Sequence, residues 1–354
     1  MRRPLLFCLL LVVALAAAPA QAWNAHGHRT IARLAVDGLP SDMPSWLKDP
    51  DTVARIAEQA CEPDRWRSTK RMVIGHELNT EHYLDIEDLT DFGLSLHTIP
   101  RQRYEYVKQM TLAKAAHPEN FKTYDPAKDL EKSKEWPGFL PYGIDEHFAL
   151  LQSSFNTLRV LEALDASDAP GKGTHGVSIH QERENIIHEM GILAHLVGDT
   201  AQPLHMTKHH HGWVGENPNA YTTDNGFHAY IDGKILDIHK FDFDSLRPAL
   251  KYERRINPAD PWDDVLAYMD RSFAKVEPLY KLQKDGTLTG EKGKEFIGGC
   301  LGDASETLAA LYTAAWEASK LDRNDVSGFI KYDERKAPQR PAQPGTKPTD
   351  PDPK

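Results

Sequence analysis

Cysteine is scarce in this chain, which has three cysteines in 354 residues. Cys8 lies within the first 22 residues, and neither Cys61 nor Cys300 has a partner at the spacing of a zinc finger, so a cysteine-based zinc module is excluded. Two interpretations remain for Cys61 and Cys300. Cys61 and Cys300 form one disulfide, as exported proteins often do, or Cys300 is a core residue on the apolar face of a late helix.

The chain also lacks an excess of positive charge. It has 42 Lys and Arg against 52 Asp and Glu, which gives a formal net charge of −10. An acidic protein does not hold a polyanion through a general basic surface, so that mode of nucleic-acid binding is excluded. If the substrate is a phosphate ester, a local site must attract it, and metal ions would do so.

Long apolar runs are missing except near the N-terminus, where residues 1–22 have the parts of a signal peptide. Arg2 and Arg3 precede the apolar stretch 5–18, and Ala-Gln-Ala at 20–22 is typical of a cleavage site. The apolar stretch is short for a membrane span, which needs about 20 residues. We therefore expect a secreted or periplasmic protein that begins at Trp23, is a monomer and has no stable protein partner.

Internal repeats and runs of alternating short strands are absent, and the prediction is an all-α fold. One mainly helical domain with long loops is expected over residues 23–336, followed by a disordered tail at 337–354 that has six prolines and no large apolar residue. Apolar residues at helical spacing predict helices. The predicted helices lie near 31–39, 53–60, 100–116, 148–164, 182–202, 262–284 and 291–321, with loops at 168–176 and 208–225.

The most informative stretch is His195-Leu-Val-Gly-Asp199-Thr-Ala-Gln-Pro-Leu-His205. His195 and Asp199 are four residues apart, so they project from one face of the predicted helix. Pro203 ends that helix, and the turned chain can bring His205 back towards its end. Two imidazoles and a carboxylate suit Zn²⁺, whereas the alternative is an amphipathic helix with a satisfied His–Asp pair.

A second pair, His228 and Asp232, has the same spacing as His195 and Asp199. One such pair is weak evidence, but two pairs with a histidine between them favour a zinc site. The zinc-protease pattern does not fit, because His188-Glu189 is followed by Ile192 where a second histidine is required. The tract 209–211 is three histidines in a predicted loop, and it is either a solvated run or a loose secondary metal contact.

At this point the sequence resembles a known superfamily, which joins the fungal-type single-strand zinc nucleases with the bacterial zinc-dependent phospholipases C. The resemblance extends from Trp23 to about residue 236, and the last third has no motif to compare. It rests on Trp23, His28, Pro-Asp64-Arg-Trp-Arg67, His82-Tyr-Leu-Asp85, His195-x3-Asp199-x5-His205 and His228-x3-Asp232.

The resemblance implies an all-helical fold with three zinc ions in a cleft. The first zinc would be held by Asp64, His82, His195 and Asp199. The second would be held by His205, His228 and Asp232. The third would be held by His28 together with the α-amine and carbonyl of Trp23, with Asp199 bridging it to the first.

The resemblance also assigns roles around the metals. Arg67 would steady the phosphate, and Asp85 would contact a nucleobase. Asp64 is a further catalytic candidate, because its carboxylate could orient the attacking water. Aromatic residues are candidates for contact with bases or with a lipid headgroup. These are Tyr83, Tyr142 and Trp213.

The sequence thus predicts an exported zinc-dependent phosphodiester hydrolase, and an endonuclease acting on single-stranded DNA or RNA is the first hypothesis. Unstacked bases can enter a cleft that lacks a basic surface for a duplex. A zinc-dependent phospholipase C is the alternative, because the segment before Asp232 lacks the tryptophan that many of the nucleases carry. A periplasmic zinc-binding protein without catalysis is the third hypothesis.

Overall fold

The computed structural model describes residues 23–69, 71–121, 125–127, 129–166, 173–322 and 324–336. The predicted signal peptide and the predicted disordered tail lie outside these residues. Within the described ranges the chain is helical without strands, and one isolated bridge joins Leu84 to Gly138. The predicted all-α, single-domain fold is confirmed. None of the described helices is both long enough and apolar enough to span a membrane.

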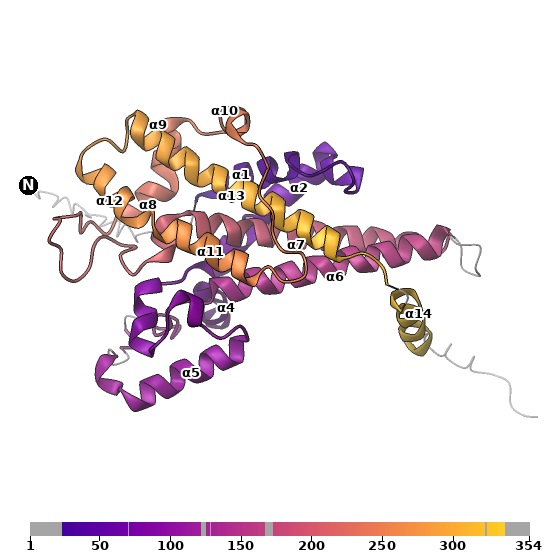
Figure 1. The fold of residues 1–354 in the computed structure, drawn as a ribbon, viewed down its shortest axis with the longest axis horizontal. Coiled ribbons are helices and arrows are strands. Elements are labelled where there is room, and N and C mark those ends of the chain that lie inside the picture. Colours follow the sequence, from indigo (N-terminus) through magenta and orange to yellow (C-terminus); the bar gives the residue numbers. More distant parts are fainter. Residues whose placement is uncertain are drawn as a thin grey trace, which may run out of the picture.

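The long helix α7 (Gly176–Ala201) forms the centre of the molecule (Figure 1). Every residue from Met190 to Ala201 is buried. A helix that is buried on all sides is expected to be apolar all round, so each polar side chain there requires a partner. The polar side chains of this half are His195, Asp199 and Thr200, and Thr200 donates to the carbonyl of Leu196 at 3.0 Å in its own helix.

Four helices pack around α7 and account for its burial. They are α1 (Ala25–Asp37), α2 (Pro50–Gln59), α6 (Leu140–Ala166) and α13 (Glu291–Ala318). Figure 1 shows α6 and α7 side by side along the longest axis of the molecule. In the C-terminal half of α6, Asn156 donates to Asp325 at 3.1 Å and so joins α6 to α14 (Asp325–Lys336).

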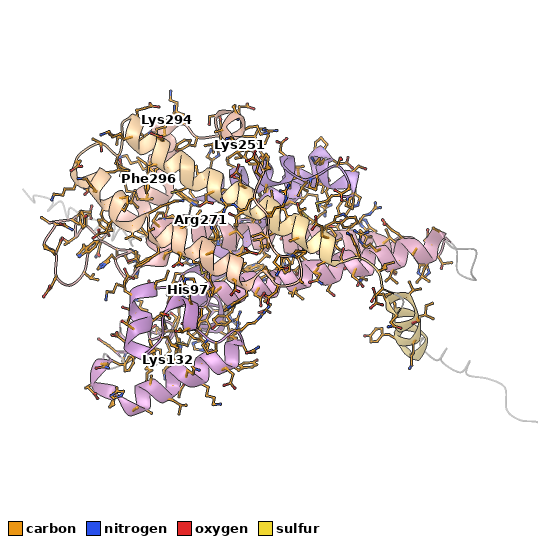
Figure 2. The ribbon with its side chains drawn as sticks, viewed as in Figure 1. His97, Lys132, Lys251, Arg271, Lys294 and Phe296 are labelled. Atoms are coloured by element: carbon orange, nitrogen blue, oxygen red, sulfur yellow. The ribbon has the colours of Figure 1, made fainter. Side chains whose placement is uncertain are left out.

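The chain between α2 and α6 forms a separate layer, which is purple in Figure 1. It contains α3 (Glu62–Arg67), α4 (Met72–Leu78) and α5 (Arg103–Ala116), with short 3₁₀ turns between them. Figure 2 labels His97 where this layer meets α11 (Trp262–Phe273), and the His97 imidazole pairs there with Asp270. The layer thereby brings residues 62–85 against the end of α7.

Short elements complete the opposite side of the molecule. They are α8 (Phe227–Ala229), a π-helical turn (Tyr230–Lys234), α9 (Ile235–His239), α10 (Phe243–Leu246) and α12 (Val276–Lys284). A cavity of about 650 Å³ lies between α10, α11 and α13, with Arg271 and Lys294 in its lining (Figure 2). None of the predicted metal ligands lines this cavity.

The helix boundaries differ from the prediction in several places. Helix α6 begins at Leu140 rather than near 148, and α3 and α4 were not expected as helices. The central helix begins at Gly176 rather than near 182, and α14 was not expected as a helix. The stretch 262–284 is two helices, separated at Ala274 and Lys275. Pro278 explains this break, because it lacks the N–H that would bond to the carbonyl of Ala274 in a continuous helix.

Both cysteines of the described chain are free and buried, so no disulfide joins them. The Cys61 thiol lies 3.6 Å from the carbonyl oxygen of Ala25, and Cys300 lies in the core on α13. Of the two interpretations, burial in the core is the one that the structure supports.

Candidate metal centre

The site begins with the two polar residues in the buried half of α7. The Nε2 atom of His195 lies 3.3 Å from Oδ2 of Asp199, and both side chains are fully buried. The other imidazole nitrogen, Nδ1, donates to the carbonyl of Ala60 at 2.8 Å. This bond fixes the tautomer and leaves the Nε2 lone pair of His195 directed at the carboxylate.

His82, at the end of a 3₁₀ turn (Asn79–His82), completes the first group of potential ligands. Its Nδ1 atom lies 2.9 Å from Oδ2 of Asp199 and 3.0 Å from Nε2 of His195. One donor atom from each of these three residues lies within 4.8 Å of the others, a geometry that can hold a metal ion. We call His82, His195 and Asp199 the first group.

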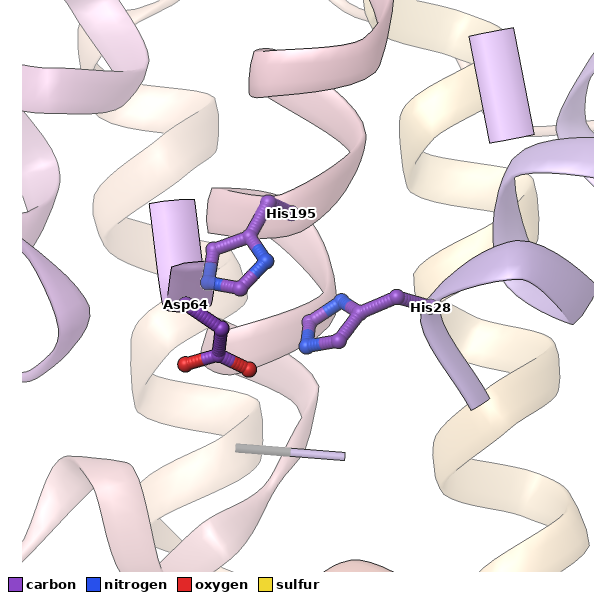
Figure 3. Close-up of side chains that lie close together, drawn as sticks. All are labelled: His28, Asp64 and His195. Carbon is purple, nitrogen blue, oxygen red and sulfur yellow. The ribbon is translucent and has the colours of Figure 1, made fainter. Parts of the chain in front are cut away.

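A further group contains His28 of α1, Asp64 of α3 and the same His195, and it is called the third group here. Figure 3 shows the three side chains pointing towards one another from three separate segments. The His28 and His195 rings stack at 4.1 Å between centroids, and Nε2 of His28 lies 3.4 Å from Oδ1 of Asp199. The two oxygens of Asp199 therefore face different histidines, which is the arrangement required of a carboxylate that bridges two metal ions.

The second group contains His205, His228 and Asp232. His205 lies in a 3₁₀ turn (Pro203–Met206) that follows the end of α7, as the position of Pro203 predicted. The rings of His205 and His228 meet edge to face at 4.9 Å, and Nε2 of His228 lies 3.5 Å from Oδ2 of Asp232. Asp232 itself is on the π-helical turn, a conformation that is common at functional sites.

Gln202 holds the second group in place and was missed in the sequence. Its side-chain nitrogen donates to Oδ1 of Asp232 at 2.7 Å, and its oxygen accepts from the backbone N–H of Leu204 at 2.7 Å. Gln202 is fully buried, and it stands in the sequence between two predicted ligands, directly before Pro203. An amide side chain between two predicted ligands could therefore have been recognised in the sequence as a residue that supports them.

The polar atoms of these groups fit a metal site because many have no hydrogen-bond partner among the described residues. These buried atoms are Nδ1 and Nε2 of His28, Oδ1 of Asp64, Oδ1 of Asp199, Nε2 of His205, both ring nitrogens of His228 and Oδ2 of Asp232. A buried polar atom without a partner costs about 1–3 kcal/mol. Metal coordination would satisfy these atoms, and imidazole with carboxylate is a donor set that suits zinc.

The electrostatics of most potential ligands point in the same direction, and His195 is the exception, since Asp199 raises its pKa against the effect of burial. Burial lowers the pKa of His28, His82 and His228, and that of His205 to about 3, which keeps their lone pairs available to a metal. Burial raises the pKa of Asp199 to about 6 and that of Asp232 well above its usual value. A divalent cation would restore the ionised form of both carboxylates.

Arg67 lies one helical turn after Asp64 on α3. Its Nη1 atom is 3.7 Å from Oδ1 of Asp64, and its side chain is 17% exposed. After burial, the positive charge of Arg67 is a further cause of the lowered pKa values of His82 and His228, which belong to different groups. The guanidinium therefore lies beside Asp64 and reaches solvent.

The predicted substrate residues have partners of their own. Asp85 is buried, burial raises its pKa, and its Oδ1 atom lies 3.5 Å from Nδ1 of His210. The half-buried Tyr83 places its hydroxyl 3.5 Å from the carbonyl oxygen of Ser133. Tyr142 is buried against Tyr106, so it cannot stack on a ligand, and the expectation for Tyr142 is wrong.

Trp23 is fully buried and packs beside Gly27 of α1. The backbone N–H of the next residue, Asn24, donates to the carbonyl of Asp232 at 2.8 Å, so the start of the described chain lies beside the second group. That the α-amine of Trp23 binds a metal with His28 stays a prediction. His188 is a packed residue, since its Nδ1 atom lies 3.1 Å from Oε1 of Gln59.

The predicted metal ligands other than Trp23 thus lie in three groups within the described residues, at the end of one buried helix. One difference concerns Asp64, which the resemblance placed with His82 and which the structure groups with His28 and His195. Comparisons of the chain with models of known families and with curated proteins find no match. The geometry supports a multinuclear metal site, independently of any relative.

Proposed function

We propose that this protein is an exported zinc-dependent phosphodiester hydrolase whose substrate is single-stranded nucleic acid. The observation that carries the proposal is the Asp199 carboxylate between two histidine groups, with Arg67 at the solvent side of the same cluster. Hydrolysis of a phosphodiester requires neutralisation of the phosphate charge and a nucleophile at neutral pH. Metal ions held by the cluster would supply the nucleophile at neutral pH, and they would neutralise the phosphate charge together with the adjacent arginine.

The residues of the three groups would hold the metal ions, with Asp199 shared between two of them. Bound zinc ions lower the pKa of water towards about 7 and neutralise charge on the phosphate. Arg67 would donate its N–H groups to a non-bridging phosphate oxygen and stabilise the charge that develops there. Asp64 would orient the attacking water with the carboxylate oxygen that does not bind the metal.

Single strands are the proposed substrate class because the acidic chain offers no general basic surface for a duplex. One observation favours a phospholipid as the second candidate. Met72 and Val73, on the helix that follows Arg67 in the chain, are 53% and 59% exposed. Exposed apolar side chains beside a phosphate site are what a lipid surface would contact.

A non-catalytic zinc-binding protein is distinguished from both enzymes by Arg67. Zinc storage requires ligands that fill the coordination sphere and has no use for a cation beside them. The position of Arg67 next to Asp64 therefore favours an enzyme.

The experiment that tests the proposal offers zinc-loaded protein four substrates in parallel: single-stranded DNA, single-stranded RNA, duplex DNA and phosphatidylcholine vesicles. The matched control is the Arg67→Ala protein, because Arg67 belongs to none of the three groups of potential ligands and its side chain is partly exposed. The expected result is cleavage of single strands by the wild-type protein and much slower cleavage by the control. Cleavage of lipid without cleavage of nucleic acid would establish the second candidate, and no diester hydrolysis by fully loaded protein would favour zinc binding without catalysis.

A further inference from the structure

The tract His209–His211 lies directly beside the second group, and neither the ligand sets nor the proposed reaction uses it. The ring centroid of His211 is 5.3 Å from that of His228, and that of His210 is 6.3 Å away. The prediction of a solvated run does not describe this tract, since its three members have different surroundings. Their surroundings indicate three different roles.

His209 is a structural residue that anchors the tract. Its buried ring stacks on Trp213 with centroids 3.9 Å apart and planes within 7°, and its Nδ1 atom accepts from the backbone N–H of Val214 at 3.1 Å. The Tyr280 hydroxyl donates to the carbonyl of His209, and the Tyr280 ring also packs edge to face against Trp213. These contacts fix the backbone at the start of the tract to α12.

His210 is half-buried and holds the tract to the neighbouring layer. Its Nδ1 atom lies 3.1 Å from the carbonyl oxygen of Thr207 and 3.5 Å from Oδ1 of Asp85. Two acceptors at the same nitrogen indicate that Nδ1 carries the proton. Asp85, which was predicted to contact a nucleobase, therefore lies within ion-pair distance of His210, although its Oδ1 atom makes no hydrogen bond to a described residue.

His211 is the exposed member of the tract. Its ring contacts the rings of His210 and His228, and its nitrogens make no hydrogen bond to any described residue. The direction of His211 is set by the next residue, Gly212, which has φ +91° and whose added Cβ would lie 2.5 Å from the carbonyl carbon of Thr223. Only glycine fits there, because other residues rarely adopt this backbone conformation and their Cβ would collide with Thr223.

His211 is also distinct from the metal ligands. Among the described residues, the groups with three donor atoms within 4.8 Å of one another do not include it. The exposed His211 imidazole lies beside potential metal ligands but is not one of them. It can therefore contact a molecule that binds at those ligands.

We infer that His211 is a substrate-contacting residue, which donates a hydrogen bond from its imidazole to an oxygen of the phosphate ester bound at the second group. This inference rests on the proposed function for the class of ligand. Because the tract is already ordered, little conformational entropy is lost when the contact forms. The contact would favour a phosphate ester over ligands without an anionic oxygen at that position.

The test compares the wild-type protein with His211→Ala, which lacks the donor, and His211→Asn, which keeps one. His117→Ala is the matched control, since His117 is an exposed histidine at the end of α5 with a local partner, Glu119, at 3.2 Å. Each protein is examined for zinc content, melting temperature, turnover of bis(p-nitrophenyl) phosphate and calorimetric affinity for inorganic phosphate.

The expected result for His211→Ala is unchanged zinc content and melting temperature, with phosphate affinity and kcat/KM lowered by about ten- to a hundredfold. His211→Asn should lose less, and His117→Ala should match the wild type. Unchanged phosphate affinity and kcat/KM in His211→Ala would overturn the inference, and so would a loss of zinc, which would make His211 a metal ligand. If the wild type hydrolyses no diester, the proposed function fails, while the phosphate titration still decides the role of His211.

Discussion

Replacement of Gly198 by alanine should disturb the metal centre without removing any ligand. Gly198 lies on α7 beside Asp199, where the His28 ring of α1 approaches the helix backbone. A Cβ added at Gly198 would lie 2.8 Å from Nδ1 of His28 and 3.1 Å from its Cε1 atom. Ordinary carbon contacts are about 3.5–4.0 Å, so the buried ring must move by roughly half an ångström or more.

The magnitude follows from two opposing effects. Alanine in a helix interior is favoured over glycine by about 0.5–1 kcal/mol, whereas overpacking a close-packed interior costs about 1–3 kcal/mol. We therefore expect a net destabilisation of up to about 2 kcal/mol. The His28 ring is stacked on His195 at 4.1 Å, so it can yield only by leaving Asp199, from which its Nε2 atom is 3.4 Å distant. Metal at the third group should be lost.

The matched control is Gly299→Ala on α13. Gly299 is also helical, but it is exposed, and an added Cβ there meets no described atom within 4 Å. This variant should gain about 0.5–1 kcal/mol and keep its zinc. The assay is zinc per chain after dialysis, together with thermal unfolding of both variants. If Gly198→Ala keeps the wild-type zinc content and is stabilised like Gly299→Ala, the packing argument for the third group is wrong.

Four further predictions concern the metals and the phosphate. Arg67→Ala should keep its zinc and lose about a hundredfold in diester turnover, because it lacks the cation that stabilises charge on the phosphate. Unchanged turnover would show that Arg67 has no role in the reaction. A strong chelator should lower the melting temperature by about 10 °C, and an unaffected melting curve would show that the metals do not stabilise the fold. Burial raises the pKa of Asp199 to about 6, so below pH 6 a metal must displace a proton from this carboxyl group. Zinc affinity measured by chelator competition should therefore fall by about tenfold or more per pH unit below pH 6, and a flat profile there would contradict this. A protein with an added alanine before Trp23 should contain less zinc than one that begins at Trp23, and equal stoichiometry would remove the terminal amine from the ligand set.

Helix prediction was accurate where a helix has one buried face and poor where it does not. The pattern of α7 begins with the buried residues near Ile186, whereas its first two turns are mostly exposed and carry no apolar signal. The same reason hid α14, which is short and largely exposed. The break between α11 and α12 was missed for a different reason, since apolar spacing continues through Pro278 although the hydrogen-bond ladder does not.

The site was predictable in its local pairs and not in its assembly. Spacing alone places His195 and Asp199 on one helix face, and the structure has them 3.3 Å apart. The contact between His28 and His195, in contrast, joins residues far apart in the chain, and no local pattern predicts it. The resemblance placed His28 beside Asp199 and assigned His195 to a different zinc ion. The surroundings of His211 were unpredictable because they depend on aromatic packing of a loop against α12.

Burial divides the site into two kinds of residue with different consequences for stability. Asp199 and His195 are in the interior of the core, where a charged or polar group without its partner costs several kcal/mol, so replacement of either should lower stability and activity together. Arg67 and His211 reach solvent, so their replacement should change turnover or phosphate affinity more than the melting temperature. When the ligands of a site are also core residues, substitutions at the residues that reach solvent are the better test. At those positions a loss of activity is not confounded with a loss of folding.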